Sequence, residues 1–386
     1  MTSLNLGEKG ANHDPNEKEW AKSVALRIFE KEKIVAKRNK NKIPYTSIKG
    51  CFDDKTNQIN WWTNGFWAGQ LWLLYHAFGE EMFREIAENI ETKLDAVLMD
   101  FMGMDHDSGF KWLLTSVANY KMTGSQVSKN RALLSASDLA GRINPAGKFI
   151  RAWNDDGSGD RAGWAIIDCM MNLPLLYWAG EVTNDPRFEQ IAMMHADTAG
   201  KAFIREDGSV AHIAVFDPAT GDFLKTLGGQ GLGEGSSWTR GQSWALYGFS
   251  LSYRHTQKQE YLETAIKVAD YVLSQIPASG IVPVDFCQDA SCTWEDSTAA
   301  AIFACGLLEL EQYAPEQDAA RYHEMALILL HTLEESRCNW SLDADHLLEN
   351  CSAAYHDEQH NFPIIYGDYY FTEAILKLCN KDLFLW

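Results

Sequence analysis

Two aspartates, Asp107 and Asp168, stand where a pair of carboxylates could perform acid–base chemistry. Each comes at the start of an apolar stretch that predicts a buried helix, and Asp168 lies between the apolar segments 165–167 and 169–171. Such burial raises the pKa of a carboxylate, and two carboxylates that share a site separate into an acid and a base at neutral pH. Either aspartate alone could instead be a helix N-cap. The pair favours catalysis, and we predict that both residues are catalytic.

Aromatic residues gather around the same helix starts. The sequence holds 14 Trp, 14 Tyr and 18 Phe, and the face of an aromatic ring can stack on the C–H face of a sugar. A large core also needs aromatic residues, so we expect the tryptophans to divide between the core and a sugar cleft. The predicted cleft residues are Trp62, Trp153 and Trp244.

Arg240 and His212 add polar groups to the same region. The guanidinium of Arg240 could bind a carboxylate through two parallel hydrogen bonds, or it could pair with an aspartate of the fold. His212 lies in a segment where apolar and polar residues alternate, and a structural histidine is the plain alternative to a functional one. Both pairs of alternatives stay open at the level of sequence.

Helices of two kinds must position these residues. The first kind is amphipathic, with charges between apolar residues at three- and four-residue spacing, and it is predicted for six segments: 17–38, 79–98, 130–143, 185–203, 258–276 and 318–335. The second kind is apolar on nearly all sides, which is typical of a helix buried all round, and it is predicted for six more: 63–78, 106–120, 168–181, 239–253, 296–310 and 367–378.

The apolar helices begin near polar residues that recur about every 60 residues along the chain, namely Asn64, Asp107, Asp168, Arg240, Asp296 and Asp368. Helical hairpins repeated at this period must stack to bury their apolar members. We predict an all-α fold, an (α/α)6 barrel formed as one domain by residues 1–386, with residues 1–16 as a flexible extension. The helix starts would then face one mouth of the barrel, where their N–H groups favour anionic ligands.

A short β-ribbon is predicted near this mouth. In the segment 209–224, alternating residues flank the turn 217–221, and we expect the ribbon to cover part of the cleft. The glycine-rich stretch 226–241 follows. It lacks the ending of a phosphate-binding loop, and we expect no strand to lead into it.

Composition excludes several classes of protein. The 386 residues carry 34 Lys and Arg against 53 Asp and Glu, a net charge of −19, and no basic stripe suited to nucleic acid is present. With 46% hydrophobic and 23% charged residues, the chain can form a large core. HExxH and GxSxG motifs do not occur, which disfavours a zinc protease and an α/β-hydrolase.

The cysteines and the N-terminal sequence predict a cytoplasmic protein. Of the eight cysteines, only Cys287 and Cys292 lie close together, and no second pair completes a zinc site. We expect reduced thiols, no metal and no cofactor. The first 20 residues lack a basic region followed by an apolar run, and no apolar run reaches about 18 residues, so we expect no membrane partner. The sequence carries no signal for an oligomeric state.

Several motifs, in order and at matching spacing, are similar to those of the unsaturated glucuronyl hydrolases of glycoside hydrolase family 88. The resemblance extends from about residue 45 to residue 378 and is carried by Trp62–Gly69, His106–Phe110, Ile150–Trp153, Ile166–Cys169, Ser237–Trp244, Asp296–Ala299 and Tyr366–Tyr370. It implies an (α/α)6 barrel, the architecture that the helix pattern predicts independently.

The resemblance also implies a reaction. Enzymes of this family remove the 4,5-unsaturated uronic acid from the non-reducing end of small oligosaccharides that polysaccharide lyases release, including those from glycosaminoglycans. A carboxylic acid protonates C4, water adds at C5, and the hemiketal opens to release the next sugar. This hydration differs from the displacement at the anomeric carbon that most glycosidases perform.

By position, the resemblance assigns the general acid/base to Asp168 and a substrate-holding role to Asp107. It assigns contacts with the uronate, the reacting carbons or the cleft to His106, His212, Gln230, Arg240, Trp244, Trp62 and Trp153.

One segment departs from the family pattern. Members that prefer sulfated disaccharides carry a Ser-x-x-Ser-x-Lys-like stretch before the Gly-Asp-Tyr-Tyr motif, whereas the segment 351–360 here has no lysine and contains Asp357 and Glu358. We therefore expect a weak preference for sulfated substrates, with Tyr355 as a cleft residue.

Other functions remain open at this level. An unsaturated rhamnogalacturonyl hydrolase would share the barrel and the acid, although Asp107 within His-Asp-x-Gly-Phe favours the glucuronyl branch. A non-catalytic sugar-binding barrel is a second alternative. An epimerase of the N-acylglucosamine type would need paired histidines, and no convincing pair occurs.

Overall fold

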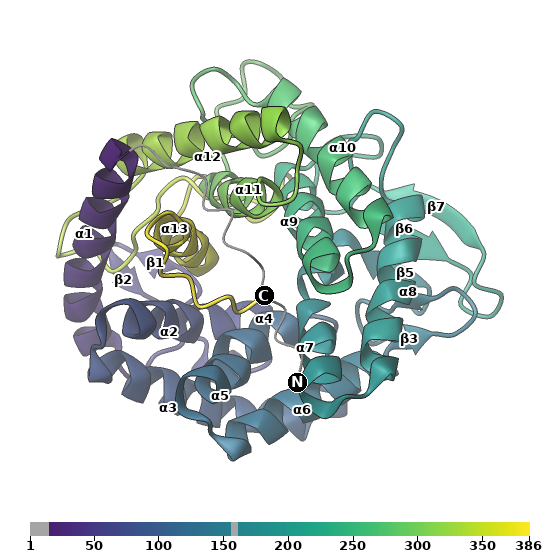
Figure 1. The fold of residues 1–386 in the computed structure, drawn as a ribbon, viewed down its shortest axis with the longest axis horizontal. Coiled ribbons are helices and arrows are strands. Elements are labelled where there is room, and N and C mark those ends of the chain that lie inside the picture. Colours follow the sequence, from purple (N-terminus) through teal and green to yellow (C-terminus); the bar gives the residue numbers. More distant parts are fainter. Residues whose placement is uncertain (1–14, 156–160) are drawn as a thin grey trace.

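The protein is described by a computed structural model over residues 15–155 and 161–386. The helices form two concentric rings (Figure 1), and this confirms the predicted (α/α)6 barrel. The outer ring consists of α1 (Pro15–Asn39), α3 (Glu81–Leu98), α6 (Gln126–Gly141), α8 (Pro186–Ala202), α10 (Gln259–Gln275) and α12 (Glu316–Ser336). Most of the predicted N-terminal extension falls on residues 1–14, outside the described residues, and α1 already begins at Pro15.

The inner ring consists of α2 (Phe66–Phe78), a composite helix, α7 (Pro174–Thr183), α9 (Thr239–Thr256), α11 (Ser297–Leu310) and α13 (Ile365–Leu378). The composite helix is α4 (Ser108–Trp112), a π-helical segment (Leu113–Val117) and α5 (Ala118–Thr123). Sequence periodicity predicts each pair of outer and inner helices. It does not reveal the π segment, because one wider turn shifts the apolar pattern too little to detect.

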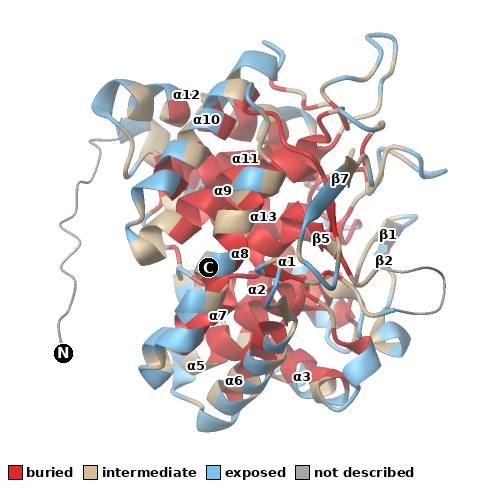
Figure 2. Cartoon of the chain, turned by 90° about the vertical axis from the view of Figure 1, so that its right-hand side faces the viewer, coloured by how far each residue is buried: buried red, intermediate tan, exposed pale blue. Residues whose placement is uncertain are grey.

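Burial explains the two helix types. In the outer helix α3, the buried residues Phe83, Ile86, Ala87 and Ile90 follow helical spacing, so one face packs inward and the other is exposed. Every residue of the inner helix α11 is buried. Figure 2 shows the same division, with buried residues in the centre and exposed ones on the periphery.

The two ends of the barrel differ in how the helices are joined. At one end, four inner helices pass to the next outer helix through a two-residue junction whose first residue has a left-handed conformation, and these residues are Gly79, Gly124, Asn184 and Gln257. Such a residue ends a helix by turning the chain sharply. At the other end, long segments connect each outer helix to the start of the next inner helix. Long loops over a rigid scaffold are where functional residues concentrate, so this second end is the mouth.

Short strands lie at the mouth, on the right of Figure 2. Two hairpins pair β1 (Ser47–Ile48) with β2 (Cys51–Phe52) and β3 (Ile143–Asn144) with β4 (Phe149–Ile150). The predicted ribbon is present as β6 (Ile213–Phe216) and β7 (Phe223–Leu227), and β5 (Trp164–Ile166) adds a third antiparallel strand.

One expectation about the ribbon was wrong. Strand β7 is the second strand of the predicted ribbon, but it extends to Leu227 and so leads directly into the glycine-rich stretch, which we expected no strand to enter. The five residues of β7 show no strict alternation of apolar and polar side chains, and its apolar residues Phe223 and Leu224 are exposed, so the strand lacks the pattern by which a half-buried strand is recognised.

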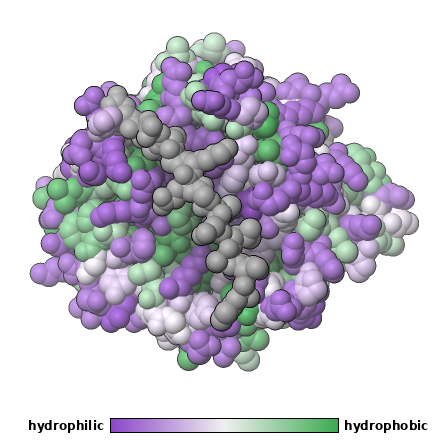
Figure 3. Space-filling model, viewed as in Figure 1, coloured by the Kyte–Doolittle hydropathy of each residue, from purple (hydrophilic) through white to green (hydrophobic). Residues whose placement is uncertain are grey.

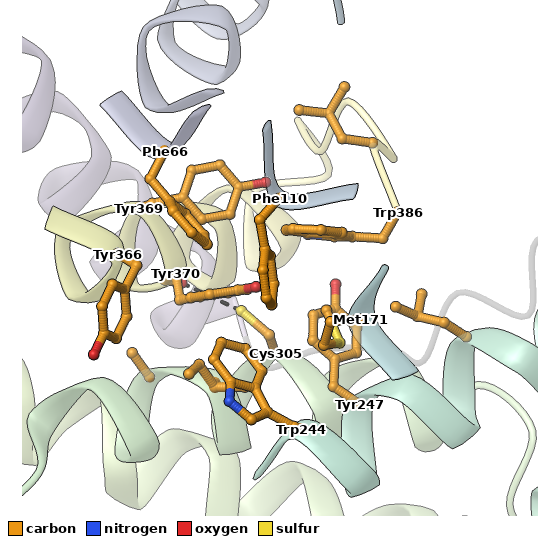
Figure 4. Packing of buried hydrophobic residues seen from close by; sticks show 14 of the residues in the cluster. Phe66, Phe110, Met171, Trp244, Tyr247, Cys305, Tyr366, Tyr369, Tyr370 and Trp386 are labelled. Atoms are coloured by element: carbon orange, nitrogen blue, oxygen red, sulfur yellow. Dashed lines mark hydrogen bonds between the residues drawn. The ribbon is translucent and has the colours of Figure 1, made fainter. Parts of the chain in front are cut away.

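Aromatic rings fill the centre of the barrel (Figure 4). Phe110 packs between Trp244 and Trp386, with ring centroids 5.2 and 6.0 Å away. Trp386 also stacks on Tyr370 at 5.8 Å, and its indole N–H donates to Glu373 at 2.7 Å. Near the C-terminus, the chain thus returns to the barrel axis and fills the end opposite the mouth (Figure 1).

The ring closes where α1 meets the last hairpin, and we call this contact the seam. Across it, the buried Lys31 donates to the carbonyl oxygens of Ser341 and Ala344 at 2.7 and 2.6 Å. Arg27 pairs with Glu334 at 2.5 Å, and Arg38 pairs with Asp345. Charged groups therefore form part of the contact that joins residues about 300 positions apart, beside the apolar residues that α1 buries.

Hydrophilic residues dominate the face that Figure 3 shows, as the large net charge requires. Over residues 15–155 and 161–386, the helices include none whose length and apolar character would suit a transmembrane span.

Candidate active site

Asp107 and Asp168 lie at the starts of neighbouring inner elements. Asp107 immediately precedes α4, and Asp168 lies in a 3-10 turn (Ile167–Met171) that connects β5 to the residues before α7. Both are largely buried, with 8% of each residue exposed. Neither side chain caps its helix, whereas Asp296 accepts the capping hydrogen bond from Thr298 N–H at 3.1 Å. The N-cap alternative therefore fails for both aspartates.

Asn172 connects the two aspartates. Its Nδ2 donates to Asp107 Oδ1 at 3.3 Å and to the Asp168 carbonyl at 3.4 Å, while its Oδ1 accepts from the backbone N–H of Phe110 at 2.9 Å. A fully buried amide with three such bonds fixes the Asp107 carboxylate relative to the backbone turn that carries Asp168. Sequence reasoning assigned Asn172 no role, although its position one helical turn after Asp168 places both on the same side of the turn.

His212 contacts Asp168 in a defined tautomer. Nδ1 of His212 accepts a hydrogen bond from the backbone N–H of Gln230 at 3.0 Å, so Nδ1 carries no proton. The ring proton is therefore on Nε2, which lies 3.3 Å from Asp168 Oδ1. His212 precedes β6, and its carbonyl accepts from Ile167 N–H at 3.1 Å, which holds it beside the turn of Asp168.

His106 is the histidine neighbour of the other aspartate. Its Nε2 lies 3.4 Å from Asp107 Oδ1, and the side chain is fully buried. Burial lowers the pKa of His106 to about 4 against the opposing influence of Asp105 and Asp168. His106 is therefore neutral at physiological pH.

The two carboxylates differ in the direction of their pKa shifts. Burial, Asp105 and Asp168 raise the pKa of Asp107 well above its usual value, although Lys111 opposes them. Burial would also raise the pKa of Asp168, but the interactions with His212, His106 and Arg240 outweigh it and lower that pKa. The pKa values of the two carboxylates are thus shifted in opposite directions, upward for Asp107 and downward for Asp168.

The expected direction for Asp168 itself was wrong. Its apolar sequence neighbours, such as Cys169, point into the core, whereas the groups that face its carboxylate come from distant segments that include His212 and Arg240. Local sequence context therefore describes the environment of the backbone here and not that of the carboxylate.

Arg240 pairs with an aspartate of the fold. Its Nη1 lies 3.0 Å from Asp296 Oδ2, and its two terminal nitrogens also donate to the carbonyl oxygens of Ser352 and Ala353. Its guanidinium lies over the Trp238 ring at 4.5 Å. The second of the two alternatives for Arg240 is the contact present in the structure, and contact with a substrate carboxylate stays a prediction.

The three predicted cleft tryptophans lie at different depths. Trp62 is partly exposed and packs on Tyr366 and Phe110, at 5.0 and 5.4 Å. Trp153 is also partly exposed, edge-on to His106 at 6.3 Å. Trp244 differs from the prediction: it has no exposed surface and packs in the core against Phe110 and Tyr370 (Figure 4), because it lies more than one turn inside α9.

Gln230 and Tyr355 join the glycine-rich stretch to the segment that precedes α13. Tyr355 N–H donates to the Gln230 carbonyl at 2.8 Å, and the Gln230 side chain donates to the Ala353 carbonyl at 2.9 Å. The partly exposed Tyr355 ring packs against Trp294 at 5.1 Å, and Trp294 stacks on His360 at 3.7 Å. This aromatic wall of Trp294, Tyr355 and His360 was not predicted as a unit, because Trp294 lies more than 60 residues before the other two.

Comparison with known proteins places these features in a family. The sequence profile of Glycosyl Hydrolase Family 88 matches residues 34–375. An unsaturated glucuronyl hydrolase from Bacillus sp. (strain GL1) is 36% identical over 341 residues, which cover 86% of this chain and 89% of the relative. An unsaturated chondroitin disaccharide hydrolase from Streptococcus pneumoniae is 34% identical over 84% of this chain and 83% of its own.

A solved structure shares the fold. It is a variant of the unsaturated glucuronyl hydrolase from Streptococcus agalactiae in complex with dGlcA-GalNAc6S. The TM-score is 0.81 at 28% sequence identity, and the similarity covers 96% of this chain and 93% of that chain.

Proposed function

The chain belongs to glycoside hydrolase family 88, and from this membership we propose that it removes a 4,5-unsaturated uronic acid from the non-reducing end of small lyase-generated oligosaccharides. The observation that carries the proposal is the pair Asp107 and Asp168, bridged by Asn172 and separated in pKa, at the mouth of the barrel. Names of the relatives favour this activity over a rhamnogalacturonyl hydrolase and over a non-catalytic sugar-binding barrel.

Asp168 is the proposed general acid/base. Its protonated carboxyl delivers a proton to C4, the C4=C5 electrons form the new C–H bond, and positive charge develops at C5 and the ring oxygen. Water attacks C5 and returns a proton to Asp168, so the group is regenerated. The hemiketal at C5 then opens, and the aglycone leaves from C1.

Binding of the substrate supplies the protonated form of Asp168. In the free protein this carboxylate is ionised, because its pKa is lowered. The uronate brings a further negative charge to the site, and a nearby like charge raises the pKa of a carboxylate. The raised pKa of Asp107 favours its protonated form, which can donate a hydrogen bond to the substrate without adding charge.

The direct test is an assay on unsaturated disaccharides from several lyases. Hydration of C4=C5 removes the conjugated chromophore, so turnover is followed as a loss of ultraviolet absorbance. We expect the loss with uronyl disaccharides and none with the saturated analogues. Binding without any loss of absorbance would identify a sugar-binding barrel instead.

Substrates without sulfate on the sugar next to the uronate are expected to react faster than sulfated ones. Segment 351–360 presents the exposed Asp357 and Glu358 and no lysine, and like charges repel. The variant Asp357→Lys should raise the ratio of kcat/KM for sulfated over unsulfated disaccharide by about 2- to 5-fold, the range of exposed charge interactions.

The matched control for this prediction is Glu316→Lys, the same change of charge at the start of α12. That position is exposed and lies at the end of the barrel opposite the mouth, so the ratio should not change. A wild-type protein that prefers the sulfated disaccharide would contradict the prediction.

We also propose a cytoplasmic location. All eight cysteines are free thiols, including the exposed Cys51 and Cys287, and such thiols persist in reducing compartments. Cell fractionation with antibody detection tests this location.

A further inference from the structure

Asp285 is a buried carboxylate outside the acid–base pair. It lies between α10 and α11 and has no exposed surface. Its Oδ2 accepts from Leu232 N–H at 2.9 Å and from the Ser236 hydroxyl at 2.8 Å, and its Oδ1 accepts from the N–H groups of Ser237 and Cys287 at 3.1 and 2.9 Å. Three of these four donors belong to the glycine-rich stretch, so one side chain holds that stretch in place.

The same stretch touches His212 on its other side. Gly231 N–H donates to the Gly228 carbonyl at 3.0 Å and closes a tight turn, within which Gly229 has φ +56°. A Cβ atom on Gly229 would lie 1.9 Å from His212 Nδ1, so the backbone lies directly against the imidazole. The next residue, Gln230, directs its N–H at Nδ1.

We infer that Asp285 is a positioning residue for the reaction. It holds residues 228–237 of the glycine-rich stretch so that the Gln230 N–H donates its hydrogen bond to His212 Nδ1. This bond fixes the tautomer in which the proton is on Nε2 and faces Asp168. This inference rests on the proposed function of Asp168. Asp285 acts through the backbone of Gln230 and His212, and it touches neither of the paired aspartates in the contacts of the described residues.

The tautomer matters because of what each ring nitrogen presents. With the proton on Nε2, His212 offers an N–H to Asp168 Oδ1 at 3.3 Å. With the proton on Nδ1, the Nε2 lone pair would face the carboxylate, and the N–H of Gln230 would meet a second N–H. The choice of tautomer is set by the hydrogen bond at the other nitrogen, and here that bond depends on the conformation of the loop.

The test is the variant Asp285→Ala in the full chain, with ¹⁵N-labelled histidine. The ring nitrogen signals of His212 are identified by their absence from the His212→Gln variant. In the wild-type protein we expect Nε2 protonated and Nδ1 unprotonated. In Asp285→Ala we expect a mixture of tautomers, and a kcat about 10- to 100-fold lower with little change in KM, as for groups that orient a functional side chain from behind.

Two further variants keep the inference falsifiable. Asp289→Ala removes an exposed aspartate that accepts from Ser291 in the same inter-helix segment, and it should change neither the tautomer nor kcat. Asp285→Asn keeps the size of the side chain and one carbonyl acceptor. It should change the tautomer ratio and kcat in the same direction as Asp285→Ala but by a smaller amount, and it replaces Asp285→Ala if that variant does not fold.

A folded Asp285 variant that retains the wild-type tautomer and kcat would overturn the inference. The NMR readout does not depend on turnover. Consequently, failure of the proposed activity would show in the wild-type assay, whereas failure of the inference would show in the His212 signals.

Discussion

Replacing Asp168 with asparagine should lower kcat on an unsaturated uronyl disaccharide by about 10²- to 10⁴-fold, the usual contribution of a general acid–base group. Asparagine preserves the shape of the side chain, but it cannot release a proton to C4 or accept one from water. The loss is measured as the rate of absorbance decrease on adding a lyase digest. Because the contacts that hold the sugar remain, the Kd for substrate, measured by calorimetry, should change little.

The control for this variant is Asp217→Asn in the turn between β6 and β7. Among the contacts of the described residues, the Asp217 carboxylate accepts only local turn hydrogen bonds from Ala219 and Thr220, and its replacement should leave kcat intact. Wild-type turnover by Asp168→Asn would remove Asp168 from the mechanism. Loss of both turnover and binding would reassign it to substrate binding.

Replacing Asp107 with asparagine should lower activity and raise stability together. The folded-state pKa of Asp107 is well above its usual value, so between the two pKa values the folded protein holds a proton that the unfolded chain has released. Stability therefore falls as pH rises through this window. Asparagine does not titrate and removes this cost, and we expect Tm at neutral pH to rise on the order of 1–3 °C.

The loss of activity in Asp107→Asn should be about 10²-fold or more, since removal of one preorganised substrate contact has this size. The opposite sign of the pKa shift at Asp168 supplies the comparison. Its carboxylate adds stability above its unfolded pKa, and this stability is lost as pH falls through the folded pKa. Asp168→Asn should therefore lower Tm slightly at neutral pH. If Asp107→Asn and Asp168→Asn changed Tm by the same amount and in the same direction, the assignment of opposite pKa shifts to the two aspartates would be contradicted.

The barrel architecture could be predicted from the sequence because it depends on local patterns of apolar residues that repeat along the chain. Six amphipathic segments alternate with six apolar ones, and this alternation leaves a ring of hairpins as the arrangement that buries the apolar members. The departures are local events with weak signals: the π segment Leu113–Val117 and the exposed strand β7.

The site was predictable only in part, because its chemistry depends on contacts across the barrel. Asp107 and Asp168 are visible in the sequence as polar residues at helix starts. The pKa of Asp168, however, depends on His212 and Arg240, which lie 44 and 72 positions away in the printed sequence. The depth of a residue within the barrel also depends on distant segments, and this is why Trp62 and Trp244, both predicted to line the cleft, differ in exposure.

The seam affects where the barrel begins to unfold. Neighbouring hairpins elsewhere follow one another along the chain, whereas α1 and the last hairpin meet without a covalent link nearby, and ion pairs form part of that contact. Salt weakens exposed ion pairs, so the partial unfolding that costs least is expected to start here. The segment that opens first carries Tyr355 and the carbonyls that hold Arg240. The protein would thus lose the predicted substrate contacts of Tyr355 and Arg240 while the acid–base pair, on the second and third hairpins, is still folded.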